Sequence, residues 1–165
     1  MKLTFAPRGI LQIDDARLIW RNFAGKASTY NREGDKNFAL VIPDPEIAEA
    51  LQNDLNKFGV GWNVKAKPPR EEGEAPLMYL PVKVKFNERG PRVFLVSGEN
   101  RRQLDEVTIA CLDSIDIAHC DLDIRPYDDE GTYGPFRAAY LHAMEVVQDV
   151  DRFSARYAEE EYPEE

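Results

Sequence analysis

The stretch Gly34–Gly59, GDKNFALVIPDPEIAEALQNDLNKFG, decides the fold of this chain. Its apolar run FALVI, which ends at Ile42, suits a strand that is buried on at least one face. Pro43 ends this strand, because proline has no N–H to donate to a sheet ladder. Asp44 is then placed to cap a helix that begins at Pro45, where a missing N–H costs nothing.

The apolar residues after Pro45 predict how far this helix runs. Ile47, Leu51 and Leu55 recur every four residues, which predicts one apolar stripe along a helix. Gly59 is the residue type that commonly follows the last helical turn. We therefore expect one strand and one helix, with the helix ending just before Gly59.

The totals of the 165-residue chain predict a single soluble domain. Hydrophobic residues make up 43 % of it, which is enough for a core without disulfides or metals. Cys111 and Cys120 lack a CxxC spacing, so a reducing compartment is the better expectation. The N-terminal residues are too polar for a signal peptide, and no run approaches the roughly 20 apolar residues of a membrane span. We expect an intracellular protein with no membrane contact.

The net charge of −9 is unevenly distributed. The last seven residues, EEEYPEE, contain five glutamates, and without them the net charge is −4. Basic residues gather in 17–36 and 65–92. A like-charged terminal block is often an interaction tail. We predict one domain over 1–157 and an acidic tail over 158–165, whose partner-binding residues are Glu159, Glu160, Glu161, Glu164 and Glu165.

Alternating apolar residues predict six or seven strands around the single helix. A barrel with one helix fits this order better than a sandwich or a doubly wound sheet. We expect a long first strand with an irregularity near Asp14-Asp15, and a bulge near His119-Cys120 in a later strand. The predicted strands are 9–23, 38–42, 61–67, 78–86 with 93–96 as its hairpin partner, 114–124 and 136–147, with loops at 97–100 and 127–134 and a short helix or irregular segment at 104–112.

Few residues are available for catalysis. His119 and Cys120 are adjacent, so in a strand they point to opposite faces. No GxSxG, HExxH or GxxxxGK[ST] motif is present. Asp121 and Asp123 would share one strand face, as carboxylates at a Mg²⁺ site can, so a metal-dependent nuclease is one interpretation. A solvated strand edge is the simpler one, and we expect no enzyme activity, cofactor or metal.

Basic and aromatic residues interleave in two clusters. A protein that binds single-stranded nucleic acid needs both kinds, because cations follow the phosphates and aromatic rings stack on bases. Alternatively, Trp20 and Tyr79 belong to the core, and the lysines protect an edge strand. The first cluster comprises Trp20, Arg21, Phe23, Lys26, Tyr30, Arg32 and Lys36, and the second Tyr79, Lys83, Lys85, Arg89 and Arg92.

The order of segments resembles that of phage-encoded single-stranded DNA-binding proteins with an OB fold. The residues that give this resemblance are Arg17–Phe23 (RLIWRNF), Gly34–Pro43 (GDKNFALVIP) with its following helix, Gly134–Arg137 (GPFR) and Val146–Gln148 (VVQ). An acidic C-terminal tail is common in that family. The resemblance implies a mostly β, OB-like barrel with one principal α-helix. It also implies sequence-tolerant binding of single-stranded DNA, in phage replication or recombination, in the cytoplasm of a bacterial host.

The resemblance further implies roles for individual residues. The DNA would lie across the loop after the first strand and the basic hairpin, which also carries Tyr79. The tail would compete for this groove and dock a replication or nuclease protein, and the chain could form a homo-oligomer. The rings expected to stack on bases are those of Trp20, Phe23 and Tyr30, and the cations expected at phosphates are Arg21, Lys26, Arg32, Lys36, Lys83 and Lys85.

An acidic inhibitor is the alternative from a different class. A small protein of charge −9 can occupy the nucleic-acid groove of an enzyme, as phage-encoded DNA mimics and anti-CRISPR proteins do. It would use the acidic surfaces of 113–130 and 159–165. Such a protein would ignore DNA and bind a basic enzyme in a salt-sensitive way.

Overall fold

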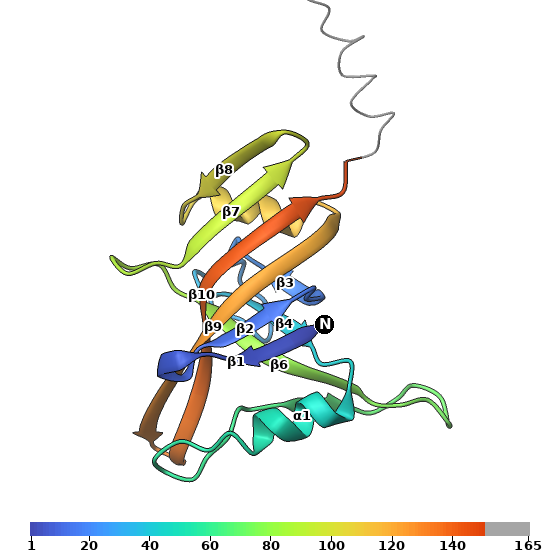
Figure 1. Ribbon diagram of the computed structural model, residues 1–165, viewed down its shortest axis with the longest axis vertical. Coiled ribbons are helices and arrows are strands. Elements are labelled where there is room, and N and C mark those ends of the chain that lie inside the picture. Colours follow the sequence, from blue (N-terminus) through green and yellow to red (C-terminus); the bar gives the residue numbers. More distant parts are fainter. Residues whose placement is uncertain (151–165) are drawn as a thin grey trace, which may run out of the picture.

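Ten strands form one branched sheet in the computed structural model, which describes residues 1–150 (Figure 1). The described residues also form one α-helix and two short 3-10 helices. The elements are β1 (Lys2–Phe5), η1 (Pro7–Gly9), β2 (Leu11–Asp14), β3 (Leu18–Asn22), β4 (Lys36–Val41), α1 (Pro45–Gln52), β5 (Lys65–Lys67), β6 (Leu77–Val84), β7 (Arg92–Ser97), β8 (Asn100–Leu104), η2 (Thr108–Asp113), β9 (Ile117–Gly131) and β10 (Gly134–Gln148).

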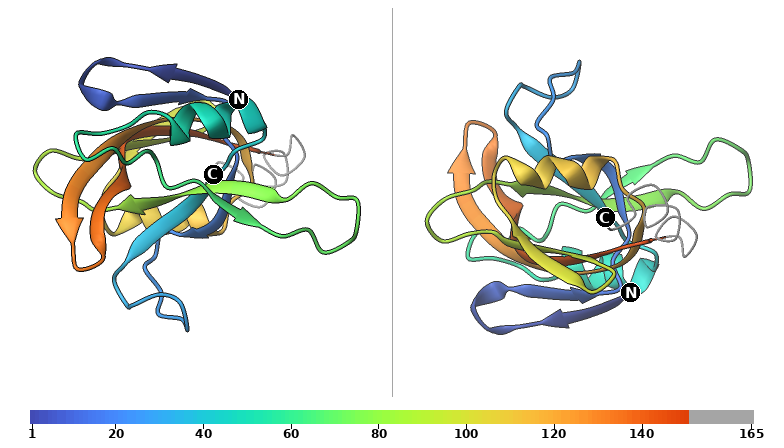
Figure 2. Two further views of the ribbon diagram at one scale, coloured as in Figure 1. Left: turned by 90° about the horizontal axis from the view of Figure 1, so that it is seen from below. Right: turned by 90° about the horizontal axis from the view of Figure 1, so that it is seen from above.

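The sheet curls into a barrel because one segment serves both of its sides. The strand order is β1-β2-β9-β10-β6-β4-β3, so β2 and β3 lie far apart in the ladder although they are neighbours in the chain. Between them, the Ala16 N–H donates to the Cys120 carbonyl of β9 (2.7 Å), and the Arg17 carbonyl accepts from the N–H of Val41, the last residue of β4 (3.0 Å). The predicted OB-like barrel is confirmed, and Figure 2 shows the curled sheet from two sides.

The predicted first strand is therefore two strands. Its irregularity was expected at Asp14-Asp15, and Asp15 has a φ of 56°, a conformation that breaks the extended chain. The expectation of one continuous strand over 9–23 was wrong, because each half pairs with a different neighbour: β2 with β9, and β3 with β4.

The strand and helix that decide the fold supply the centre of the core. Phe38, Leu40 and Ile42 are all buried, and α1 adds Ala48 and Leu51. The predicted N-cap is confirmed, since the Asp44 carboxylate accepts the Glu46 N–H at 2.8 Å. Burial of such side chains is the main source of folding free energy.

The helix is shorter than predicted. It ends at Gln52, and Leu55 is 59 % exposed instead of extending the buried stripe. The chain turns back after Gln52, and the Trp62 N–H donates to the Leu51 carbonyl at 3.1 Å. Gly59 has a positive φ of 80°, but it closes a separate turn with Asn56 and does not cap the helix. The predicted strand 61–67 is accordingly reduced to β5.

The predicted hairpin between 78–86 and 93–96 is wrong. Both strands exist as β6 and β7, but β7 pairs in parallel with β10 and antiparallel with β8. Alternation shows that a segment suits a strand, but it does not show which strand is its neighbour. The predicted loop at 97–100 is a tight turn that leads into β8, and the segment 104–112 contains the start of η2.

The last two strands form the longest hairpin of the fold. The predicted strand 136–147 is confirmed as β10, whereas the predicted loop 127–134 was wrong, because β9 continues to Gly131. The predicted bulge is confirmed: the register steps from His119 to Ile117, which leaves Ala118 as the extra residue.

Pro81 lies within β6, where its missing N–H interrupts no ladder. One edge of β6 pairs with β4 throughout, while the other pairs with β5 up to Tyr79 and with β10 at Lys83. Within the described residues, Pro81 has no strand neighbour on that second edge. Pro81 therefore lies at a local gap in the pairing of β6, where a proline costs no ladder hydrogen bond.

Phe23 gives a direct test of the core. Its ring is 0 % exposed and stacks on Phe38 at 5.3 Å between centroids. We expect Phe23→Ala to lower the free energy of unfolding by about 3–5 kcal/mol, because it leaves a large cavity. Urea denaturation measures this, and Tyr30→Ala, at a ring that is 98 % exposed, should keep the wild-type midpoint. Equal midpoints for both variants would contradict the assignment.

Candidate nucleic-acid interface

One open groove brings the two basic–aromatic clusters together. It has a volume of about 720 Å³ and crosses β4 and β6 beside the loop that follows β3. The sequence could not establish whether the two clusters share a surface, and the structure places several members of each on one. The predicted residues that line it are Trp20, Tyr30, Arg32, Lys36, Lys83 and Lys85.

Trp20 presents its ring at one end of this groove. It lies at an irregularity in the β3–β4 register and has a φ of 50°, which is unusual for a bulky residue. The ring is 51 % exposed, with the Tyr79 ring edge-on at 4.8 Å and the Lys67 ammonium 5.5 Å away. Tyr79 thus supports Trp20 from the side, and part of the indole remains open to solvent.

The loop between β3 and β4 carries Tyr30 and Arg32. The Asn31 amide braces this loop by donating to the carbonyls of Lys26 (2.9 Å), Arg32 (3.0 Å) and Asp35 (2.9 Å). Tyr30 is 98 % exposed, whereas Lys26 is exposed at the base of the loop but does not line the groove. A braced loop holds an exposed ring in place without burying it.

A row of paired residues crosses four strands and links the groove to the long hairpin. Asn37 on β4 is opposite Lys83 on β6, Lys83 is opposite Tyr140 on β10, and Tyr140 is opposite Arg125 on β9. The Lys83 ammonium and the Arg125 guanidinium lie 6.0 Å and 5.1 Å from the Tyr140 ring centroid. Neighbouring residues in register share a face of the sheet, so this row forms a basic–aromatic surface.

The sequence analysis missed Tyr140 and Arg125. Tyr140 was placed in the last strand, but its face was not compared with that of the basic hairpin. Arg125 precedes a segment that was predicted as a loop. The alternation of Phe136, Ala138 and Tyr140 was the available signal, because it places two aromatic rings on one strand face.

Three residues of the first cluster have structural roles. Phe23 is fully buried, which corrects the expectation that it stacks on a base. The Arg21 guanidinium donates to the carbonyls of Leu112 (2.7 Å) and Ile115 (2.9 Å), so it holds η2 instead of facing the groove. Lys36 lines the groove, and its ammonium also donates to the Phe23 carbonyl at 3.0 Å.

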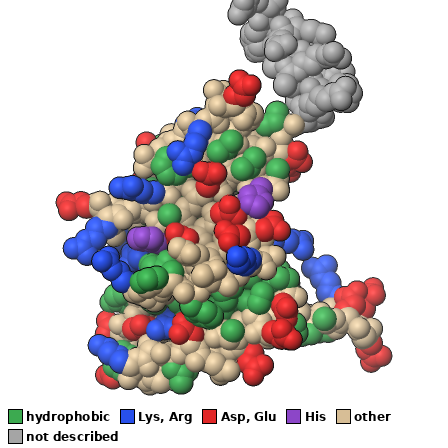
Figure 3. Space-filling model, in the orientation of Figure 1, with side chains coloured by type: hydrophobic (Ala, Val, Ile, Leu, Met, Phe, Trp, Pro, Cys, Tyr) green, Lys and Arg blue, Asp and Glu red, His purple; other side chains and the backbone are tan. Residues whose placement is uncertain are grey.

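Acidic side chains lie mostly elsewhere. In the orientation of Figure 3, Asp and Glu cover the middle of the face that β2 and β9 help to form. There Asp121 accepts the Asp15 N–H at 2.9 Å and contacts the His119 ring nitrogen at 2.8 Å. Two carboxylates, those of Asp35 and Glu106, line the groove, and they are outnumbered by its four cations. These cations are Arg32, Lys36, Lys83 and Lys85.

No group of three or more His, Cys, Asp or Glu side chains within 1–150 is arranged to hold a metal ion. Cys111 and Cys120 are free thiols, and burial raises the pKa of Cys120 to about 12, so that it is a poor nucleophile. Cys120 is buried and His119 exposed, which confirms that they face opposite sides. Within the same residues, no helix has the length and apolar composition to cross a membrane.

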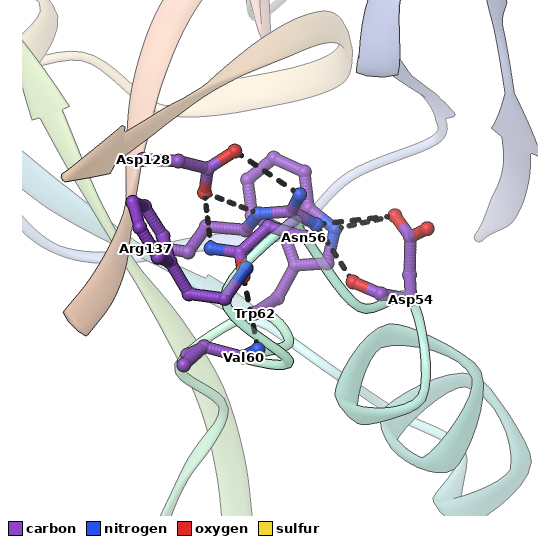
Figure 4. Close-up of polar contacts among 7 residues, drawn as sticks. Asp54, Asn56, Val60, Trp62, Asp128 and Arg137 are labelled. Atoms are coloured by element: carbon purple, nitrogen blue, oxygen red, sulfur yellow. Dashed lines mark hydrogen bonds and ion pairs between the residues drawn. The ribbon is translucent and has the colours of Figure 1, made fainter.

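A buried arginine fixes the long hairpin near its turn (Figure 4). The Arg137 guanidinium donates to both Asp128 oxygens, at 2.8 and 3.2 Å, and to the Asp54 carbonyl at 2.7 Å. It lies 4.9 Å from the Trp62 ring, whose N–H donates to the Asp54 carboxylate at 2.9 Å, and Asn56 donates to Asp128 at 2.8 Å. We call these five residues the Arg137 cluster; it ties the chain after α1 to β9 and β10.

Comparisons with known proteins agree on one group. The family model described as "Putative phage ssDNA-binding domain" matches residues 3–165. A solved structure of the single-stranded DNA-binding protein from bacteriophage Enc34 in complex with ssDNA has a TM-score of 0.57 at 15 % identity, covering 92 % of this chain and 93 % of that one. A C-terminal truncation of that protein has a TM-score of 0.57 at 15 % identity and covers 92 % of this chain and 91 % of that one. A third structure, also of the single-stranded DNA-binding protein from bacteriophage Enc34, has a TM-score of 0.55 at 16 % identity and covers 94 % of this chain and 99 % of that one. At this identity the likeness to solved structures shows a shared fold. No curated protein matches the chain.

The Arg137 cluster predicts a dependence of stability on pH. Burial raises the pKa of Asp128, but the hydrogen bonds from Arg137 and Asn56 outweigh it and hold that pKa below its usual 3.8. A carboxyl whose folded-state pKa is lowered stabilises the protein above the unfolded-state value, and this contribution is lost as the pH falls through the folded-state pKa. We therefore expect the free energy of unfolding to fall less from about pH 5 to about pH 2 in Asp128→Asn than in the wild type. Urea titrations across this range measure it, with the exposed neighbour variant Glu130→Gln following the wild type. Identical pH profiles for Asp128→Asn and the wild type would refute this assignment.

Proposed function

The chain belongs to the family of phage ssDNA-binding domains, and from that premise we propose that its groove binds single-stranded DNA with little sequence preference. The observation that supports this site is the meeting of the two basic–aromatic clusters in a single groove. A strand of DNA requires rings for its bases and cations for its phosphates along one path.

The groove residues fall into two roles. Trp20, Tyr30 and Tyr140 supply rings, which stack on any base because every base has a π face. The cations that line the groove come from the loop after β3, from β4, and from β6 and the turn after it. Sequence tolerance follows, because neither stacking nor phosphate contact reads the edges of the bases. The proposed phosphate contacts are Arg32, Lys36, Lys83 and Lys85.

Binding of this kind suits an accessory protein of phage replication or recombination. We place it in the cytoplasm of the bacterial host, where unpaired DNA forms during copying, and assign it no catalytic step. The acidic tail over 158–165 lies outside the described residues; we propose that it competes for the groove and docks a replication or nuclease protein. Self-association along DNA remains part of this proposal.

An acidic inhibitor is less well supported by the geometry. A DNA mimic must present free carboxylates, but several in 113–130 are engaged within the fold. Asp113 accepts the N–H groups of Phe23 (2.7 Å) and Ala24 (3.0 Å), and Asp128 is paired with Arg137. Anisotropy of a labelled oligo-dT strand, with a duplex control, separates the two functions, because an inhibitor would bind neither.

Trp20 tests the stacking role. We expect Trp20→Ala to weaken binding of oligo-dT by about 1–3 kcal/mol, which is roughly 5- to 150-fold in Kd. The matched control is Phe5→Ala, which removes another half-exposed ring (51 %) from β1, away from the groove. Fluorescence anisotropy at low salt measures both. Equal losses in the two variants, or no loss in Trp20→Ala, would show that Trp20 is not a contact.

The lysines of β6 and the turn after it test the phosphate contacts. The double variant Lys83→Gln/Lys85→Gln should bind more weakly and should reduce the slope of log K against log salt by about 1.4, because each lost phosphate contact removes about 0.7. Lys2→Gln on β1 removes an exposed lysine outside the groove and should keep the wild-type slope. A slope that does not change in the double variant would rule out these two contacts.

A further inference from the structure

A second groove opens where β6 and β10 separate. The two strands pair only at Lys83 and Tyr140, and the first residues of β10 diverge from β6. The chain after α1 forms the third wall, which gives a groove of about 580 Å³. Its lining includes Leu80 and Pro81 of β6, Phe136 and Ala138 of β10, and Asn63 of the chain after α1.

The second groove is continuous with the first. Pro81 and Lys83 line both of them, so Lys83 stands at the passage between the two. Aromatic rings also connect the two grooves, because Tyr140 lines the first and Phe136 lines the second. Between them lies Tyr127 of β9, whose ring centroid is 6.0 Å from that of Tyr140 and 6.1 Å from that of Phe136. Phe136 is 38 % exposed, so part of its ring is free to contact a ligand.

The lining of the second groove suits a nucleotide. Gln52 and Asn63 are exposed amides that can donate to phosphate and sugar oxygens, contacts that do not read sequence. Ala138 leaves room beside the Phe136 ring. None of the described residues that line this groove is acidic, whereas the first groove contains Asp35 and Glu106. The lining of the second groove therefore adds no carboxylate that would repel an anionic strand.

The walls of this groove are fixed in place. The Arg137 cluster ties the chain after α1, through Asp54 and Asn56, to Arg137 of β10 and Asp128 of β9. Gly61 packs so closely on α1 that an added Cβ would lie 2.1 Å from the Gln52 carbonyl oxygen. A preformed wall spares a ligand the cost of ordering it.

We propose that a DNA strand lying in the first groove continues past Lys83 into the second, where a base stacks on Phe136. This inference rests on the proposed function and adds a second subsite to it. It predicts that affinity rises in two stages with strand length, as the first groove and then the second groove fills. OB folds cover about 4–16 nucleotides, which gives the range of lengths to test.

The test is a length series of oligo-dT, from about 4 to about 16 nucleotides, bound to the full chain and measured by anisotropy. We expect Phe136→Ala to match the wild type on the shortest strands and to bind the longest ones roughly 5- to 150-fold more weakly. Trp20→Ala should weaken binding at every length. Phe5→Ala is the matched control and should follow the wild type throughout.

A second variant fills the groove without removing the ring. Ala138→Leu places a larger side chain in the opening, and it should reproduce the length-dependent loss of Phe136→Ala. Urea midpoints close to the wild type confirm that both variants are folded.

Four outcomes would overturn the proposal or its premise. If Phe136→Ala follows the wild type at all lengths, or loses affinity equally at all lengths, the second subsite is wrong while the first groove stands. The same holds if Ala138→Leu binds long strands as the wild type does. If the wild type binds no strand of any length, the proposed function itself fails.

Discussion

The double hydrogen bonding of Ala16 and Arg17 is the constraint on which the rest of the structure depends. These adjacent residues bond to β9 on one side and to the end of β4 on the other, at 2.7 and 3.0 Å. One short segment thereby links β9 and β4, which are separated by β10 and β6 in the strand ladder, and so draws the two sides of the sheet together. The strands β10, β6, β4 and β3 follow one another in that ladder, and the groove lies across them.

The same fold explains how a chain of net charge −9 can present a surface for a polyanion. Several carboxylates are used inside the structure, where Asp113 caps the end of β3 and Asp128 holds Arg137. Lys83 and Lys85, by contrast, remain exposed on or beside β6. Interactions between exposed charges fall off within about 10 Å at ordinary salt. The local charge of the groove therefore matters more for DNA binding than the total.

Most of the strand segments, the start of the helix and several basic and aromatic residues of the groove could be predicted from the sequence. These depend on local patterns: the period-two alternation of Leu80, Val82 and Val84, and the Asp44-Pro45 cap. The pairing of β7 with β10 could not be predicted, because it depends on contacts between residues about 50 positions apart. Nor did local pattern show that α1 stops at Gln52, since Leu55 continues the apolar spacing and only the returning chain at Trp62 ends the helix.

The assignment of Trp20 and Phe23 to one functional cluster failed for a related reason. The register of β3 with β4 shifts between Ile19 and Asn22, and Trp20 has a positive φ. An extra residue in a strand changes which side chains face the core, and nothing in RLIWRNF marks where it lies. Trp20 consequently stays outside, while Phe23 turns inward onto Phe38.

The Arg137 cluster is better understood as a positioning device than as a source of stability. Removing an arginine and two carboxylates from water costs free energy, and well-packed apolar residues often replace buried ion pairs without loss. An apolar contact, however, has no preferred direction, whereas the guanidinium fixes Asp128 and the Asp54 carbonyl through three hydrogen bonds of set geometry. These bonds set the distance between the hairpin and the chain after α1, and that distance is the width of the second groove. A rigid groove favours binding because less of the interaction free energy is spent on ordering the protein.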